Sequence, residues 1–168
     1  MSLNHKNRMI HLTSATKAQK QVLANLMQLY LHELSQYDQA YPDADGRYNL
    51  GPYFDLYWTE PQRFPYLICK QTAPIGFALV REIGNKTYSV AEFFIIRAVR
   101  RTGYGAQAAH TLFDRHPGRW QVAQEQENNP AQAFWKSVIA TYTNNHFEAS
   151  WSHSSPKGPM QIFSTRTQ

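Results

Sequence analysis

An apolar run that leads directly into a basic, glycine-containing segment constrains the fold of this chain more than any other feature. Phe93-Phe94-Ile95-Ile96 predicts a buried strand, and Arg100-Arg101-Thr102-Gly103-Tyr104-Gly105-Ala106 predicts a short loop that opens a helix. The glycines carry no Cβ and let the backbone come close to a ligand. The first N–H groups of a helix lack partners and lie at the positive end of its dipole. With Arg97, Arg100 and Arg101 beside them, these groups predict a phosphate site, most simply for a diphosphate.

The same segment resembles motif A of the GNAT superfamily of N-acetyltransferases, written Arg/Gln-x-x-Gly-x-Gly/Ala. It reads here as Arg100-x-x-Gly103-x-Gly105. A second segment, Asn128-Asn129-Pro130-Ala131-Gln132-Ala133-Phe134-Trp135, resembles the family's Asn-x-x-Ala-x-x-aromatic/aliphatic-Tyr and follows at the expected spacing. The two matches cover residues 92–147, and the first half of the chain follows the family in its order of predicted elements.

The resemblance implies acetyl-CoA as cosubstrate. In the family, motif A grips the pyrophosphate, and the preceding strand pairs its backbone N–H and C=O groups with pantetheine. One N–H near the thioester would stabilise the developing oxyanion. Acetyl-CoA is therefore expected between the Phe93–Ile96 strand and the helix bearing Trp135. The residues expected to bind it are Phe93, Phe94, Ile95, Arg100, Arg101, Thr102, Gly103, Tyr104, Gly105, Ala106, Asn128, Phe134 and Trp135.

Glu92 opens the apolar run and is the candidate catalytic residue. A partly desolvated carboxylate has a raised pKa and can serve as a general base, directly or through water. Family members often place a base glutamate near this position of the strand. A solvent-facing glutamate at the end of a sheet is the alternative interpretation.

Trp135 departs from the family, which commonly has at this position a tyrosine that protonates the leaving CoA thiolate. An indole N–H donates a hydrogen bond but cannot deliver a proton as an acid. Either another group protonates the thiolate, or the thiolate leaves unassisted. Trp135 is expected to be a core residue or a wall of the CoA site.

A Tyr- and Asp-rich connection over residues 37–57 is expected on the acceptor side, because the family's first helix pair and its loop usually cover the substrate. Such side chains could attract and box an ammonium group, or form a solvated loop with tyrosines packed beneath it. The candidate acceptor residues are Tyr37, Asp38, Tyr41 and Tyr53. The resemblance implies a primary amine acceptor, with a peptide N-terminus, lysine, polyamine, aminoglycoside and small amino acid all open.

The periodic segments predict an α+β fold, a mixed α/β sandwich. The resemblance to the GNAT family implies a mostly antiparallel central sheet with helices on both faces. The order of the segments is β-α-α-β-β-β-α-β-α-β-β, which is also that of the GNAT fold, in one domain of residues 1–168. The first strand is expected from Arg8 to Thr13. The first helix follows a Thr16-x-x-Gln19 capping box, and its predicted apolar face consists of Val22, Leu23, Leu26, Leu29, Tyr30 and Leu34. Further predicted signals are a hairpin turn at Gly84-Asn85, a helix from Gly103 to Arg115 and a helix N-cap at Asn129.

The composition of the chain narrows the classes of partner that it is expected to bind. The formal net charge of +5 comes without a basic tail, so no nucleic-acid partner is predicted. No apolar run approaches a membrane span, and seven scattered histidines lack the spacing of a metal site, so neither a membrane nor a metal is predicted. The lone Cys69 excludes an intramolecular disulfide and suits a reducing cytoplasm. The resemblance adds a possible homodimer, because GNAT-like proteins often pair through their C-terminal strands.

Two other functions stay open at this stage. A CoA-binding regulatory or interaction module without turnover would account for Trp135. A dinucleotide-binding oxidoreductase would use Gly103-x-Gly105-x-x-Ala108, with Glu125 downstream. Two features argue against the oxidoreductase. Residues 97–102 separate the predicted strand from the glycines, whereas a dinucleotide-binding strand enters its glycine turn almost directly, and the preceding hairpin is antiparallel. An N-acetyltransferase that uses acetyl-CoA is the favoured interpretation.

Overall fold

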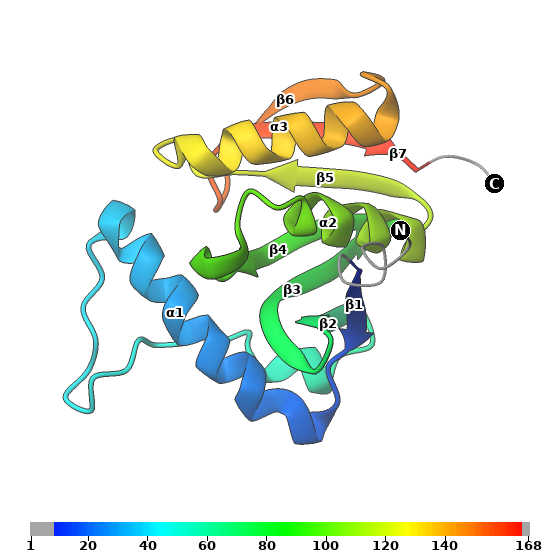
Figure 1. The fold of residues 1–168 in the computed structure, drawn as a ribbon. Coiled ribbons are helices and arrows are strands. Elements are labelled where there is room, and N and C mark those ends of the chain that lie inside the picture. The colour runs from blue at the N-terminus through cyan, green and yellow to red at the C-terminus, as the bar shows by residue number, and fades with distance from the viewer. Residues whose placement is uncertain (1–8, 166–168) are drawn as a thin grey trace. The chain divides into compact units, whose positions relative to one another are not determined.

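The computed structural model describes residues 9–165, and these form a seven-stranded sheet with α-helices (Figure 1). The strands are β1 (Ile10–Ser14), β2 (Arg63–Lys70), β3 (Ala73–Gly84), β4 (Thr87–Ile95), β5 (Arg119–Ala123), β6 (Glu148–Ser152) and β7 (Gly158–Ser164). The α-helices are α1 (Lys20–Asp38), α2 (Tyr104–Arg115) and α3 (Asn129–Thr143). Short 3₁₀ helices lie at Lys17–Gln19, Asp55–Trp58 and Arg97–Val99. The predicted α+β fold is confirmed. The second of the two helices predicted between the first and second strands is a 3₁₀ turn, Asp55–Trp58. Arg8, where the first strand was expected to begin, lies outside the described residues.

The strands follow the order β1-β2-β3-β4-β5-β7-β6. β4 and β5 pair in parallel and are joined through α2, whereas β1 with β2, β5 with β7, and β6 with β7 pair antiparallel. A parallel pair needs a crossover connection, and α2 supplies it. The mostly antiparallel sheet that the family resemblance implies is therefore confirmed.

Contacts within the chain group its residues into two compact units that share β3, β4 and α2. The first unit holds the described residues up to Leu79 together with Glu92–Ala108, and the second holds Val80–Ala91 together with the described residues from Ala109 onward. Each unit has its own core. A single domain over residues 1–168 stays a prediction.

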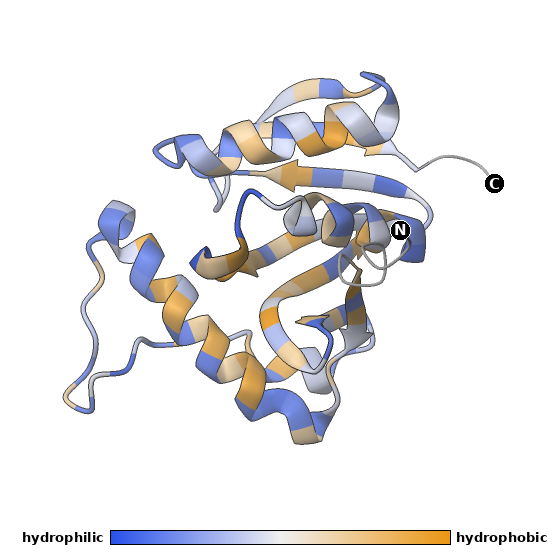
Figure 2. Cartoon of the chain, in the orientation of Figure 1, coloured by the Kyte–Doolittle hydropathy of each residue, from blue (hydrophilic) through white to orange (hydrophobic). Residues whose placement is uncertain are grey.

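In the first unit, α1 buries only part of the face that was predicted. Leu23, Leu26 and Met27 are buried, and Tyr30 continues the stripe one turn later. These positions follow the spacing i, i+3, i+4 and i+7 of an amphipathic helix. Figure 2 shows apolar residues through the middle of α1 and hydrophilic residues at its two ends. Val22 and Leu29 were predicted on the buried face and are instead exposed, at 36% and 52%.

The start of α1 follows its predicted signal. Thr16 N–H donates to Gln19 Oε1 at 3.0 Å, and Gln19 N–H donates to Thr16 O at 2.9 Å. The capping box therefore forms, but it opens a short 3₁₀ turn that leads into α1.

The hairpin between β3 and β4 turns one residue later than predicted. Gly84 still belongs to β3, and Asn85 and Lys86 form the turn. Lys86 takes a positive φ of 50°. The glycine therefore marked the end of the strand and not the turn itself.

In the second unit, aromatic side chains form the core around Phe113 of α2. Its ring centroid lies 4.9 Å from that of Trp120, 4.9 Å from that of Phe163 and 5.0 Å from that of Tyr142. His116 follows α2 and is buried. Burial, followed by the charge of Arg115, lowers the pKa of its imidazole.

Over residues 9–165, every helix is too short or too polar to cross a membrane.

Candidate active site

Glu92 and Tyr30 form the central polar contact of the first unit. Glu92 lies in β4 and is half-buried, and Tyr30 projects from α1. The Tyr30 hydroxyl donates a hydrogen bond to Glu92 Oε2 at 2.5 Å. A hydrogen bond from a neutral donor to a carboxylate is charge-assisted and short, and it fixes the direction of the acceptor. The structure thus places the predicted base next to a tyrosine that sequence reasoning did not select.

Aromatic rings surround this contact. The Tyr30 ring lies 5.7 Å from that of Phe77 and 5.8 Å from that of Phe94, and the latter two rings are 5.8 Å apart. Phe77 and Phe94 are buried. Glu92 is therefore not the solvent-facing glutamate at a sheet end that was the alternative interpretation.

The end of β4 runs into the predicted loop and α2. Ile96 N–H donates to Ile75 O of β3 at 2.9 Å, which holds the strand end in place. β4 pairs with β5 over Thr87–Ser89, and Phe93, Phe94 and Ile95 lie beyond that ladder. Phe94 and Ile95 are buried, so their side chains serve the core, as expected, whatever their backbone groups bind.

The glycine-containing loop is exposed and has an unusual backbone. Arg101 and Gly103 take positive φ angles of 61° and 88°. A Cβ added at Gly103 would have no heavy atom within 4 Å, so glycine is needed there for its backbone conformation and not for space. Thr102 Oγ1 donates to Val99 O at 2.6 Å and closes the loop onto the preceding 3₁₀ turn. α2 begins at Tyr104, which is buried and has the Lys70 ammonium 5.4 Å from the centre of its ring.

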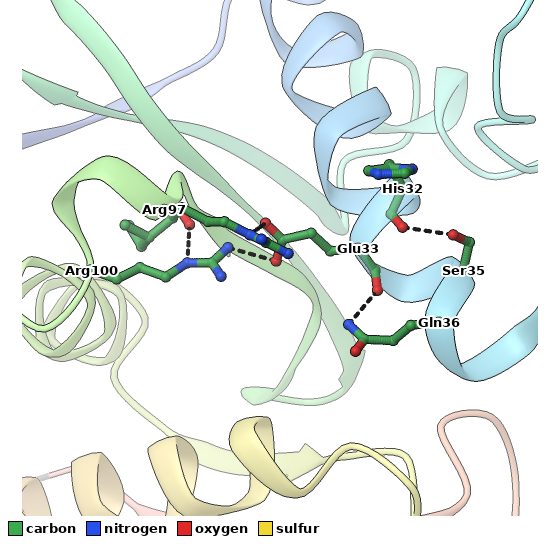
Figure 3. A network of polar contacts seen from close by, with 7 residues as sticks. His32, Glu33, Ser35, Gln36, Arg97 and Arg100 are labelled. Atoms are coloured by element: carbon green, nitrogen blue, oxygen red, sulfur yellow. Dashed lines mark hydrogen bonds and ion pairs between the residues drawn. The ribbon is translucent and has the colours of Figure 1, made fainter.

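Arg97 and Arg100 converge on one carboxylate, that of Glu33 in α1 (Figure 3). Arg97 Nε lies 3.0 Å from Glu33 Oε1, and Arg100 Nη2 lies 2.7 Å from Glu33 Oε2. Arg100 also donates from Nε to Ile95 O at 2.8 Å. The sequence predicted both arginines as part of a phosphate site but did not point to Glu33. Nothing in the sequence around Glu33 indicates that it pairs with residues 64 and 67 positions away.

The acceptor-side segment is held to α1 by Gln28. Its Nε2 donates to Tyr48 O at 2.9 Å, and Tyr48 N–H donates to its Oε1 at 2.7 Å. Among the candidate acceptor residues, Tyr37 is half-buried in the last turn of α1, and Tyr41 is 89% exposed. Tyr53 is 59% exposed and its ring lies 5.2 Å from the guanidinium carbon of Arg63.

The acidic side chains of that segment have structural tasks. Asp38 Oδ1 accepts from Ala40 N–H at 2.9 Å, which terminates α1. Asp43 Oδ1 accepts from the N–H groups of Asp45 at 2.9 Å and Arg47 at 3.0 Å. These contacts support the interpretation of a self-structured polar loop, and a role for Asp38 toward an ammonium group stays a prediction.

In the second unit, the candidate cofactor residues lie at the start of α3. Asn128, and not the predicted Asn129, is the N-cap, because its Oδ1 accepts from Ala131 N–H at 3.1 Å. Trp135 is buried at 6% exposure, with its ring centroid 6.4 Å from that of Phe113 and 5.0 Å from that of Phe134. Trp135 is thus a core residue, which was one of the two expectations for it.

The remaining tyrosine on that helix is also engaged. The Tyr142 hydroxyl donates to Asp114 Oδ1 at 2.7 Å, and its ring lies 5.3 Å from that of His110. Among the described residues, no three His, Cys, Asp or Glu side chains gather as a metal site requires.

Comparisons with known proteins agree with this fold. Residues 25–138 match the model of the acetyltransferase (GNAT) family. An acetyltransferase from Thermus thermophilus aligns with a TM-score of 0.70 and 14% identity, over 93% of this chain and 97% of that one. The ribosomal-protein-S18-alanine N-acetyltransferase of Escherichia coli aligns with a TM-score of 0.60 and 11% identity, over 94% and 93%. A ribosomal L7/L12 alpha-N-protein acetyltransferase in complex with coenzyme A aligns at 0.61 and 14%, over 93% and 94%. No curated protein matches the sequence.

Proposed function

This chain belongs to the acetyltransferase (GNAT) family, and we propose that it transfers the acetyl group of acetyl-CoA to a primary amine. Family membership makes it a CoA-dependent acyltransferase. The observation that carries the finer proposal is the carboxylate of Glu92, held by Tyr30 among aromatic rings three residues before the end of β4.

The loop after β4 is proposed to hold the pyrophosphate of acetyl-CoA. The N–H groups at the start of α2, the positive end of its dipole and the exposed Arg97 and Arg101 suit a diphosphate. Gly103, open on its Cβ side, leaves room for phosphate oxygens beside the backbone. Residues 100–106 are therefore the proposed phosphate-binding segment, with the backbone of Phe93, Phe94 and Ile95 proposed for pantetheine. Contacts of Asn128, Phe134 and Trp135 with CoA stay predictions.

In the proposed reaction, Glu92 takes a proton from the acceptor ammonium, directly or through one water. Acetyl-CoA supplies an activated thioester carbonyl. The amine nitrogen forms a bond to the carbonyl carbon, the carbon–sulfur bond breaks, and the nitrogen loses its second proton to solvent. Because a thiolate is a good leaving group, the thiolate can depart without a protein acid and be protonated by solvent. Orientation of the two substrates supplies much of the rate.

The acceptor class is proposed as a primary amine without a narrower assignment. Two of the aligned structures are named for acetylation of ribosomal proteins, one at an alanine and one at an α-amine. Peptides with a free N-terminal amine are therefore the first acceptors to test. A homodimer and a cytoplasmic location also stay predictions.

The alternative of a CoA-binding module without turnover rested on Trp135. Trp135 packs in the core of the second unit, so its presence there has a structural explanation that does not involve loss of catalysis.

The test is release of free CoA thiol from acetyl-CoA in the presence of a panel of amines, with peptide α-amines, lysine, polyamines and aminoglycosides. At least one amine should accelerate thiol release, and Glu92→Gln should lower that turnover about hundredfold or more while acetyl-CoA still binds. Binding of acetyl-CoA without amine-dependent release would favour the module without turnover. Unchanged turnover in Glu92→Gln would remove Glu92 from its proposed role.

A further inference from the structure

Glu33 is the one carboxylate on the described part of α1 that reaches the proposed phosphate-binding segment through ion pairs. Its side chain is 20% exposed, and each of its two oxygens accepts a hydrogen bond from a different arginine. A carboxylate that divides its two oxygens between two guanidinium groups fixes the separation of those groups. Glu33 therefore sets where Arg97 and Arg100 stand relative to α1, within the first unit.

Arg100 carries the tie from α1 into the end of β4. Besides its contact with Glu33, its Nε donates to Ile95 O at 2.8 Å. Its guanidinium carbon also lies 5.5 Å from the centre of the Phe94 ring. Three contacts of different kinds leave the Arg100 side chain little freedom to turn toward a phosphate. The Arg100 side chain thus anchors the loop to α1 and to the end of β4. The positive charge that can face a ligand comes instead from the exposed Arg97 and Arg101.

Arg97 differs from Arg100 in its exposure. Its side chain is 74% exposed, although Nε contacts Glu33 at 3.0 Å. Arg97 opens the 3₁₀ turn Arg97–Val99, and Thr102 Oγ1 joins Val99 O of the same turn at 2.6 Å. Displacement of the turn would therefore pass through Thr102 to Gly103 and the start of α2.

We propose that Glu33 is a positioning residue for acyl-CoA binding. Through Arg97 and Arg100 it holds residues 97–103, which are the 3₁₀ turn and the start of the proposed phosphate-binding segment, in their binding conformation. The inference rests on the proposed function, in which residues 100–106 bind the pyrophosphate. Glu33 acts through the arginines and does not itself touch the substrate.

The sign of one substitution separates this proposal from simple electrostatics. A carboxylate near a polyanion repels it, so electrostatics alone predicts that Glu33→Gln tightens acetyl-CoA binding. If Glu33 positions the segment, Glu33→Gln instead weakens binding about tenfold, because a charged hydrogen-bond acceptor shared by two arginines is lost. The expected kinetic signature is a raised KM for acetyl-CoA with kcat and the acceptor KM nearly unchanged.

The experiment is calorimetric titration of acetyl-CoA into the full chain and into Glu33→Gln, with Glu148→Gln as the matched control. Glu148 is exposed in β6 of the second unit, so its substitution removes one negative charge outside the unit that holds the segment. Binding weakened in Glu33→Gln and unchanged in Glu148→Gln supports the proposal. Equal or tighter binding in Glu33→Gln overturns it.

A second substitution tests the route through Arg100. Arg100→Lys keeps the charge but loses the guanidinium fork that contacts Glu33 and Ile95 together. Combined with Glu33→Gln, it should weaken binding by less than the sum of the two single effects, because both variants lose the contact between Glu33 and Arg100. Additive losses would overturn action through Arg100.

Hydrogen exchange distinguishes failure of this inference from failure of the proposed function. Val99 N–H and Arg100 N–H are hydrogen-bonded within the turn, at 3.3 and 3.2 Å. Without any ligand, both amides should exchange faster in Glu33→Gln than in the unaltered chain. Unchanged exchange overturns the tie even if acetyl-CoA binds. Faster exchange in a chain that does not bind acetyl-CoA supports the tie and overturns the proposed function alone.

Discussion

The hydroxyl group of Tyr30 allows a direct test of Glu92 as the proposed general base. Tyr30→Phe keeps the ring that packs against Phe77 and Phe94 and removes only the hydroxyl that donates to Glu92. Turnover with an amine acceptor should fall about tenfold, because Glu92 loses the donor that orients it. In a Glu92→Gln background, Tyr30→Phe should have little further effect. Steady-state kinetics on the two single variants and the double variant measures this, and independent losses would show that Tyr30 acts elsewhere.

Gly103 tests the backbone of the proposed phosphate-binding segment. Gly103→Ala places a Cβ in open space but at a φ of 88°, so it strains the loop by about 1 kcal/mol without a clash. Gly46→Ala is the matched control, because Gly46 also lies at a positive φ, 74°, with no heavy atom near an added Cβ. Both variants should lose similar stability in urea unfolding. Only Gly103→Ala should raise the KM for acetyl-CoA, and an equal rise in both would argue against a binding role for the loop.

At the scale of the element, the close approach of β3 to β4 depends on Gly76. A Cβ added there would lie 2.1 Å from Phe94 O, which the two strands cannot accommodate without moving apart. Gly76→Ala should therefore lower the free energy of unfolding by about 1–3 kcal/mol. Urea unfolding followed by tryptophan fluorescence measures the change. A stability equal to that of the unaltered chain would mean that β4 can shift, and the backbone proposed to pair with pantetheine would not be fixed.

The elements also show what sequence patterns can and cannot predict. The strand, loop and helix around Gly103 were predicted within one or two residues, because glycine, arginine and apolar periodicity are local signals. The buried face of α1 was only partly predicted, since Val22, Leu26 and Leu29 match a helical period as well as Leu23, Leu26 and Met27 do. Only the packing against the sheet chooses between the two faces. The Glu33 contacts needed the folded chain, because their partners lie more than 60 residues away in the sequence.

Considered as a whole, the molecule should lose stability below neutral pH through His116. Burial, then the charge of Arg115, lowers the pKa of the His116 imidazole from its ordinary 6.5, and Glu82 opposes this in part. The folded chain therefore holds His116 neutral while the unfolded chain takes up a proton. The free energy of unfolding that His116 contributes is fully present above about pH 6.5 and falls as the pH decreases toward the folded-state pKa.

The matched variant is His116→Phe, which keeps a ring beside Tyr88 and Trp120, at 4.8 and 6.1 Å in the unaltered chain. Urea unfolding at about pH 7.5 and about pH 5.5 should show a smaller loss of stability in the variant than in the unaltered chain. Identical losses would mean that other groups account for the acid sensitivity.

The order of the elements, and with it the family fold, could be predicted from the sequence because each element carries its own periodicity and most carry a boundary signal. The division of contacts into two units could not, because β3, β4 and α2 contribute to both and no linker marks the boundary. Trp135 illustrates the same limit at a single position, since only its packing against Phe113 and Phe134 shows that it belongs to a core.

Calorimetric titration of the full chain with acetyl-CoA, repeated on Gly105→Trp, tests the account most directly. The indole introduced in the first turn of α2 would occupy the space proposed for the pyrophosphate, while circular dichroism checks that the variant is folded. The account predicts saturable binding by the unaltered chain, in the micromolar range typical of enzyme substrates, and its loss in Gly105→Trp. Absence of binding by the unaltered chain, or equal binding by a folded Gly105→Trp, would contradict it.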